Sequence, residues 1–133
     1  MMDGALTATI IGYAFKVHKA LGPGFQEKVY ENALRIDLVK HGLRVKQQEP
    51  LKVWYGGQVV GDFSVDLLVE DLIIVELKAV RSLAKQHEIQ LVNYLTATKM
   101  DIGLLINFGS SVQIKRKHRE YKARISFRQD LPA

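Results

Sequence analysis

The chain contains no cysteine, which excludes disulfides, thiol catalysis and cysteine-ligated iron–sulfur clusters. Its four histidines show no HExxH or other paired ligand spacing, so a zinc hydrolase site is not expected. The sequence also lacks a Walker-type phosphate loop and a GxSxG nucleophile motif. No apolar run is long enough to span a bilayer, and the first residues lack the basic region of a secretory signal. These absences favour a cytoplasmic protein with no membrane partner.

The length and composition are those of a single globular domain. The 133 residues are 47% hydrophobic and 25% charged, which is ordinary for a folded protein, and we expect one domain over residues 1–133. The formal net charge of +5 permits a polyanionic partner.

Two apolar runs, "GDFSVDLLVE" and "LIIVELKAV", are the most informative part of the sequence. Short β-rich runs joined by a brief polar turn predict a hairpin, and the second run has the apolar character of a central strand. Asp66, Glu76 and Lys78 therefore lie where buried sheet is expected. Ionised groups in such places cost several kcal/mol each unless they are paired or bind a metal.

The connection between the two strands decides whether these side chains meet. Glu76 and Lys78 are two residues apart, so they project to the same face about 7 Å apart. A two-residue turn would pair Asp66 with Val75 and place it on the wrong face. A three-residue turn or a bulge would pair Asp66 with Glu76, so we predict one of these.

Two adjacent carboxylates with a lysine suit a divalent cation. Hard oxygen ligands favour Mg²⁺ or Mn²⁺, which can activate water and neutralise a phosphate, while the lysine stabilises the developing charge. The alternative is a structural ion pair between Glu76 and Lys78 at a sheet edge, because E-x-K is a common tripeptide.

Apolar periodicity and turn residues predict the remaining elements. Glycine-containing turns are expected after His41, at Gly56-Gly57, and at Gly109-Ser110-Ser111. The predicted helices are 6–21, 26–41 and 84–97, and the predicted strands are 44–48, 51–55, 58–69, 72–79, 102–108, 111–117 and 124–127.

Basic residues concentrate towards the end of the chain. They form a candidate phosphate-contacting surface, and the alternative is an edge strand blunted by charge; the two interpretations are compatible. The main residues are Lys115, Arg116, Lys117 and Arg119, and His118, Lys122, Arg124 and Arg128 belong to the same surface.

The ordered motifs resemble a known group of proteins. Asp66, Glu76-Leu77-Lys78 and the later Gln90 resemble the PD-(D/E)XK nuclease superfamily. Gly24-x-x-Glu27-x-x-Tyr30, followed by "VELKAV", "QLVNYL", "GLLINFG" and "IKRK", is similar to the small GxxExxY proteins within it. The similarity runs from about residue 10 to about residue 117.

The resemblance implies an α/β (α+β) fold with a restriction-endonuclease-like core, in which helices flank a central mixed sheet. It implies that Asp66 and Glu76 are ligands of Mg²⁺ or Mn²⁺ and that Lys78 is the catalytic lysine. Glu27 would be an outer acid that holds a water of the metal or a second ion. Gln90 would contact the metal water, the lysine or the phosphate. Family members often carry arginine two residues before the aspartate, where this chain has Ser64.

Other residues are expected to support this site. Glu31 shares a helix face with Glu27 and lies close to Tyr30. His87 and Tyr94 share a face with Gln90, but we favour a partly exposed helix position for His87 and a packing role with a hydrogen bond for Tyr94.

The sequence therefore predicts a metal-dependent nuclease acting on nucleic acid, with DNA as the expected substrate. The first alternative is a catalytically silent module that binds nucleic acid or a protein partner. The second is an enzyme that hydrolyses a small phosphodiester. The small size of the chain is compatible with a homodimer or a larger complex.

Overall fold

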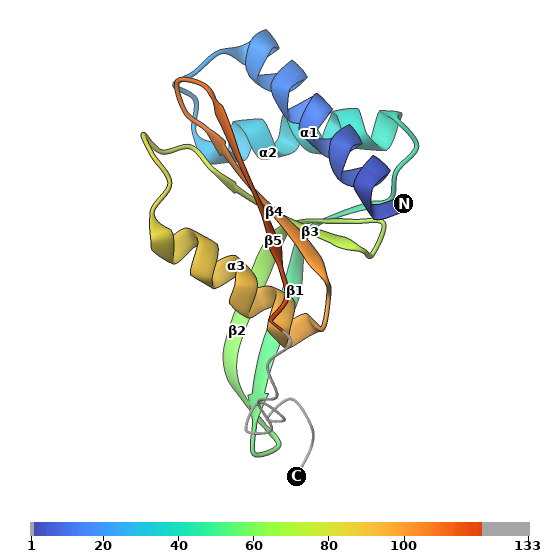
Figure 1. The fold of residues 1–133 in the computed structure, drawn as a ribbon, viewed down its shortest axis with the longest axis vertical. Helices are drawn as coiled ribbons and strands as arrows, with labels where there is room; N and C mark the ends of the chain where they lie inside the picture. Colours follow the sequence, from blue (N-terminus) through green and yellow to red (C-terminus); the bar gives the residue numbers. More distant parts are fainter. Residues whose placement is uncertain (1, 121–133) are drawn as a thin grey trace.

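The computed structural model describes residues 2–120, in which two helices precede three strands, a third helix and two further strands (Figure 1). Within this range the five strands form one sheet in the order β1-β2-β3-β4-β5. Strands β3 and β4 are parallel and the other neighbours are antiparallel, so the sheet is mixed. The elements are α1 (Met2–Leu21), α2 (Glu27–Lys40), β1 (Val45–Tyr55), β2 (Gln58–Val69), β3 (Ile73–Lys78), α3 (Lys85–Thr98), β4 (Ile102–Phe108) and β5 (Val112–His118).

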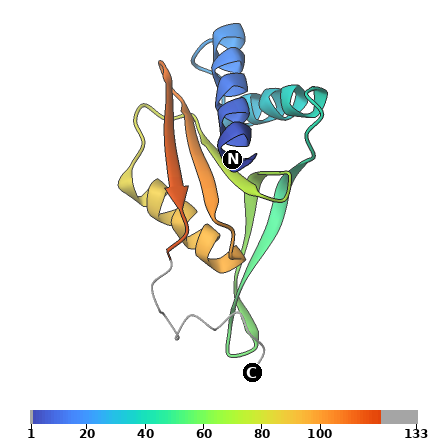
Figure 2. The ribbon, with the colours of Figure 1, turned by 45° about the vertical axis from the view of Figure 1, so that its right-hand side comes forward.

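Helices cover both faces of the sheet. Helices α1 and α2 pack on one face, and α3, which joins the parallel strands β3 and β4, packs on the other (Figures 1 and 2). Side chains alternate along β3, so Val75 lies in the cluster under α1 and α2 while Ile74 lies in the cluster under α3. Both faces are therefore buried, as the apolar runs predict.

The connection between β2 and β3 has the predicted odd length. Val69 pairs with Ile73, Leu68 with Ile74 and Leu67 with Val75, which leaves three residues in the turn. The same register places Asp66 opposite Glu76. The prediction of a three-residue turn or bulge is confirmed, and the two acids meet across neighbouring strands.

Strand β1 differs from the prediction, because one strand replaces the two expected over 44–48 and 51–55. Gln48 has a left-handed backbone with φ of 53° and has no partner in the pairing with β2, whose register is constant from Val45 to Val53 and shifts by one residue between Val53 and Trp54. Opposite this point the alternation of β2 also breaks, because Val65 packs under α3 while Leu67 packs under α1 and α2. The irregularity distorts the sheet without ending the strand.

The outer half of the β1–β2 hairpin extends beyond the sheet as a two-stranded arm (Figure 2). We call residues 53–63 the β-arm. Gly56 and Gly57 form its turn, as predicted, and both have positive φ, which glycine adopts without steric cost. Most side chains of this part of β2 are exposed. The helix that lies nearest to the β-arm is α3 (Figure 1).

The other predicted elements are present within a few residues of their expected ends. Helix α2 ends before Gly42, whose φ of 100° is the left-handed conformation that the prediction required. Strand β5 pairs antiparallel with β4 across the Gly109-Ser110-Ser111 turn. The predicted strand 124–127 lies outside the described residues. No helix in the described range is long and apolar enough to cross a membrane.

We predict that Gly103→Ala destabilises the protein by about 1–3 kcal/mol, because overpacking a filled core carries this cost. A Cβ at Gly103 would lie 2.8 Å from the Cδ1 atom of Leu91, a fully buried side chain between α3 and β4. Gly12→Ala in α1 is the matched control, because a Cβ there meets no heavy atom within 4 Å. In urea unfolding, the free energy of unfolding should fall for Gly103→Ala and rise by up to about 1 kcal/mol for Gly12→Ala. Equal stability of the two variants would contradict the packing between α3 and β4.

Candidate active site

The carboxylates of Asp66 and Glu76 each accept a hydrogen bond from a backbone amide of the opposite strand. The Asp66 amide donates a hydrogen bond to Glu76 Oε2, and the Leu77 amide donates one to Asp66 Oδ2, each at 2.8 Å. The carboxylates thus accept bonds from amides beyond the last paired residues of the β2–β3 ladder. Each carboxylate keeps a second oxygen outside this exchange, so the pair can still bind another group.

Burial makes these acids difficult to ionise. Glu76 is 8% exposed, and burial together with the charge of Asp66 raises its pKa from 4.5 to about 8. Burial also raises the pKa of Asp66, although its bonds from Leu77 and Gln48 oppose the increase. Two neighbouring acids of this kind favour a proton or a cation between them.

Glu27 and Lys78 act on the same pair of acids. Burial raises the pKa of Glu27, and the negative charge of Asp66 raises it further, whereas the charge of Lys78 lowers it. The charge of Lys78 also lowers the pKa of both Asp66 and Glu76. Within residues 2–120 the Lys78 ammonium forms no hydrogen bond and no ion pair. The four predicted residues therefore share one electrostatic environment, and the lysine has no structural partner that would explain it.

Gln48 connects Asp66 to a second acid on α2. Its amide nitrogen donates to Asp66 Oδ1 at 3.1 Å and to the two oxygens of Glu31 at 3.2 and 3.0 Å. Its amide oxygen accepts a bond from the Ser64 hydroxyl at 2.9 Å. Ser64, where the resemblance led us to expect arginine, thus orients a neutral donor beside the aspartate. The sequence reasoning missed Gln48, because its left-handed backbone carries no signal in the local residue pattern.

Glu31 and Tyr30 hold the start of α2 in place. Glu31 is 1% exposed and accepts bonds from Lys28 and Gln47 in addition to Gln48. The Tyr30 hydroxyl donates to the Gly22 carbonyl at 2.6 Å and accepts a bond from the Phe25 amide. These contacts secure the loop before α2, and Glu27 is the first residue of that helix. Both residues therefore fix the position of Glu27 indirectly, by holding the first turn of α2 and the loop before it.

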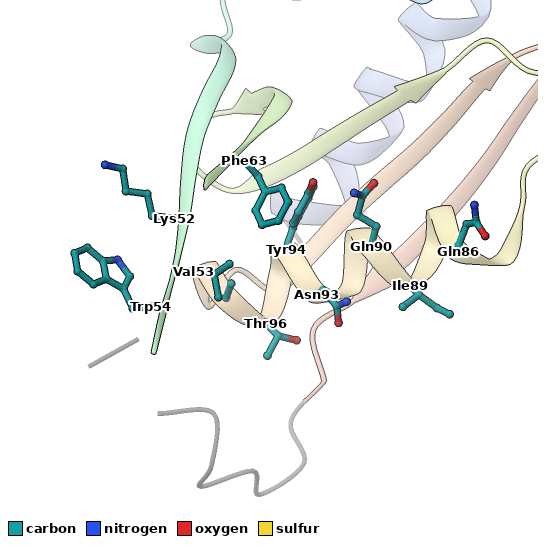
Figure 3. A pocket seen from close by; sticks show the side chains of 11 residues that line it. Lys52, Val53, Trp54, Phe63, Gln86, Ile89, Gln90, Asn93, Tyr94 and Thr96 are labelled. Carbon is teal, nitrogen blue, oxygen red and sulfur yellow. The ribbon is translucent and has the colours of Figure 1, made fainter. Parts of the chain in front are cut away.

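Helix α3 brings Gln90 and Tyr94 to the other side of the acids. Tyr94 is 7% exposed, and burial raises its pKa with further contributions from the charges of Glu76 and Asp66. Its hydroxyl has no hydrogen bond to the described residues, so the predicted bond is missing while the predicted packing is present. Gln90 is exposed and extends on the same side of α3 as Tyr94 (Figure 3).

His87 has a local role at the helix start. Its Nδ1 accepts a bond from the Ala84 amide at 3.1 Å, and its own amide donates to the Ala84 carbonyl at 3.0 Å. This exchange satisfies backbone groups that the first turn of a helix leaves unpaired. The interpretation of His87 as a helix residue outside the chemistry is consistent with this geometry.

Residues 115–118 of the predicted basic surface lie on β5, an edge strand of the sheet, as the alternative interpretation expected. Arg119 follows the strand, and Lys122, Arg124 and Arg128 lie outside the described residues. Three of the four main residues of this surface have partners within the protein. Lys117 pairs with Glu88 at 3.0 Å, Arg119 with Asp101 at 2.9 Å, and Arg116 donates to the Thr7 hydroxyl at 2.8 Å. Lys115 is exposed. A role in binding nucleic acid stays a prediction for all four.

The residues fit a divalent cation by their chemistry. Glu27, Asp66 and Glu76 supply hard oxygen donors, and each of the three has a raised pKa that a positive charge would offset. Among residues 2–120 no group of three acidic, histidine or cysteine side chains already stands close enough to form a finished metal site. An ion held by Asp66 and Glu76 would complete its coordination with water, because Mg²⁺ commonly binds through one or two carboxylates.

A mixed sheet flanked by three helices, with acids and a lysine meeting on β2 and β3, defines a restriction-endonuclease-like domain. The chain belongs to the PD-(D/E)XK nuclease superfamily, whose family model matches residues 4–120. The match does not separate the GxxExxY proteins from the rest of the superfamily, so that finer assignment stays an interpretation of the motif.

Two solved structures share the fold at low identity. One is the crystal structure of SSO0001, with 17% identity and a TM-score of 0.57 over 77% of this chain and 54% of that one. The other is an alkaline exonuclease from Laribacter hongkongensis, with 12% identity and a TM-score of 0.54 over 77% of this chain and 61% of that one. The chain thus spans little more than half the length of these proteins. A search of curated proteins finds no match.

We predict that the metal-free protein loses stability as the pH rises from about 4.5 to about 8, the ordinary and folded-state pKa values of Glu76. The folded protein holds this proton more tightly than the unfolded chain, so the contribution of Glu76 to stability is greatest at low pH and falls by up to about 1.4 kcal/mol for each pH unit in this window. Glu76→Gln should flatten the profile and stabilise the protein at pH 8. Thermal unfolding in EDTA measures both effects, and a wild-type profile that rises with pH in this window would contradict the assignment.

We predict that Gln48→Ala destabilises the protein by about 1–3 kcal/mol, because the buried Glu31 carboxylate loses hydrogen bonds. Gln48→Gly loses the same bonds but relieves the left-handed backbone, which costs a residue with a Cβ about 1–2 kcal/mol. The glycine variant should therefore be the more stable of the two in urea unfolding. If the alanine variant were as stable as wild type, the amide would have no part in holding the acids.

Proposed function

We propose that the protein is a divalent-metal-dependent nuclease that hydrolyses phosphodiester bonds in nucleic acid, with DNA as the first substrate to test. The observation that carries the proposal is that Glu27, Asp66, Glu76 and Lys78 act on one another electrostatically at one partly buried place around the buried Glu76. Three acids with raised pKa values and an unpaired lysine are costly to maintain at one place in a folded protein. Membership of a nuclease superfamily supports a catalytic reason for that cost.

Asp66 and Glu76 would hold Mg²⁺ or Mn²⁺, with Glu27 as an outer ligand or a ligand to its water. When bound, the cation supplies Lewis-acid charge and an activated water for attack on phosphorus. Gln48 fixes the Asp66 carboxylate through its Oδ1 atom and leaves the charge of that acid unneutralised. The chain therefore orients its main ligand with a neutral donor.

Lys78 and α3 would act on the substrate. The Lys78 ammonium lies within the field of all three acids and can neutralise charge that develops on the phosphate. Gln90 extends from α3 beside Tyr94, where its amide can donate to a phosphate oxygen. Lys115 and its neighbours on β5 would add contacts to the nucleic-acid backbone, and a homodimer or larger complex would extend this surface.

A second candidate is a nuclease-like module that binds nucleic acid or a protein partner without cleaving. It is favoured by one observation, namely that the described residues contain no finished group of three metal ligands. In that case the acids and Lys78 would serve binding alone. Turnover distinguishes the two candidates directly.

We predict that Lys78→Ala lowers cleavage of DNA by at least about 100-fold while it leaves Mn²⁺ affinity nearly unchanged, because it removes charge stabilisation but no ligand. Asp66→Asn should instead weaken Mn²⁺ binding in calorimetry. Lys16→Ala, an exposed lysine on α1, is the matched control and should cleave like wild type. The substrate panel contains single-stranded, duplex and branched DNA and RNA, with Mg²⁺, Mn²⁺ or EDTA.

Cleavage that persists in EDTA would contradict the metal requirement, and normal cleavage by Lys78→Ala would remove the lysine from the mechanism. Binding of nucleic acid without turnover of any substrate, by a wild type that binds Mn²⁺, would favour the silent module.

A further inference from the structure

A pocket of about 530 Å³ lies between α3 and the β-arm, beside the candidate active site (Figure 3). This volume is within the range of small-molecule sites. Tyr94 belongs to both places, because it lines the pocket while the charges of Asp66 and Glu76 act on its hydroxyl. Gln90 also lines the pocket. If a ligand placed its phosphate at Asp66 and Glu76, the part of the ligand next to that phosphate would thus lie in this pocket.

One wall of the pocket is aromatic. Phe63 on the β-arm is 43% exposed, although it is a large apolar side chain. Its ring centroid lies 5.6 Å from that of Tyr94, with an angle of 46° between the planes, and the two rings stand side by side in Figure 3. Because Tyr94 is buried, Phe63 offers the accessible face. An exposed ring of this kind is a surface on which another flat ring can stack.

The facing wall on α3 is rich in amides. Gln86, Gln90 and Asn93 line the pocket, and within the described part of the chain none of these side chains forms a hydrogen bond. Each amide offers a donor and an acceptor, so together they match a ligand whose edge carries both. Among the residues of the described range that line the pocket, Lys52 is the one that carries a charge, and none is an acid.

This combination narrows the chemistry of the ligand. A purely aliphatic chain would leave the amides unpaired, and an isolated anion would meet a single cation. A flat, neutral heteroaromatic ring with polar edges uses both the phenylalanine and the amides. Nucleobases have this chemistry, and Lys78, together with a cation held by the acids, would suit the phosphate that follows a base along a strand.

We propose that this pocket binds an unpaired nucleobase of a strand whose phosphodiester lies at the candidate active site. The inference rests on the proposed function and adds a substrate class, namely single-stranded nucleic acid or an unpaired segment of a duplex. Bases within a duplex have both faces stacked, so they reach such a pocket only after unpairing. Phe63 would stack on the base, and the amides of α3 would contact its edge.

The test uses the full chain carrying Lys78→Ala, with EDTA present, so that binding is separated from cleavage. Trp54, the single tryptophan of the sequence, also lines the pocket, with its ring directed away from α3 (Figure 3). Trp54→Phe combined with Phe63→Trp therefore moves the only tryptophan to the position beside Tyr94. The probes are oligothymidine, oligouridine, the duplex of the former with its complement, and an abasic strand with the same number of phosphates.

We expect the single strands to quench this tryptophan and the abasic strand to leave its emission unchanged, with the duplex well below the single strands. The DNA and RNA arms identify the source of the base, and either one supports the pocket. In the chain that retains Trp54, Phe63→Ala should weaken binding of labelled single strands by about tenfold, the scale of one lost base stack. Tyr55→Ala is the matched control, because Tyr55 is a 65% exposed aromatic residue of the β-arm outside the pocket, and its affinity should equal that of the parent chain.

Equal quenching by the abasic strand, or unchanged affinity of Phe63→Ala with a normal circular dichroism spectrum, would overturn the base pocket. If wild type still cleaves nucleic acid in that event, the proposed function stands without it. If no probe binds and wild type cleaves nothing, both the base pocket and the proposed nuclease function are contradicted. A tryptophan signal that depends on protein concentration alone, with dimers in sedimentation, would assign the pocket to a second copy and overturn the inference.

Discussion

The register between β2 and β3 is the constraint on which the rest of the molecule depends. The three-residue turn after Val69 sets Asp66 opposite Glu76, and each carboxylate then accepts a backbone amide from the opposite strand. A shift of one residue would turn Asp66 to the other face and separate it from Lys78. Because β3 lies in the middle of the sheet, between β2 and β4, its neighbours hold this register from both sides.

Around this pair the protein accepts an electrostatic cost that an apolar sheet would avoid. Glu27 and Asp66 repel each other and Glu76, and burial makes each charge less favourable. Hydrogen bonds from the main chain and from Gln48 offset part of this cost, and Gln48 itself has a backbone conformation that is unfavourable for a residue with a Cβ. Stability lost at one place in this way is typical of functional sites, where local rules give way to the chemistry.

Period-two alternation in the sequence was sufficient to predict most of the sheet. The pairing of Asp66 with Glu76 was predicted on the further premise that the charged side chains form one site, because the local pattern alone left the length of the turn open. The single long strand β1 could not be predicted, because Gln48 interrupts the pattern without ending the strand. The pocket beside Phe63 and the partners of Arg116 and Lys117 depend on which distant elements pack together, and a local pattern does not contain that information.

The exchange of bonds between Asp66 and Glu76 also has a consequence for the proposed metal site. Each acid rests on a main-chain amide that belongs to the sheet itself, so its resting position does not require a bound ion. Under the proposed function, binding and loss of the ion would therefore be a local exchange of partners within an intact sheet. A chelator would then remove the ion without unfolding the chain, whereas zinc-finger domains, whose folding depends on the ion, unfold when it is removed.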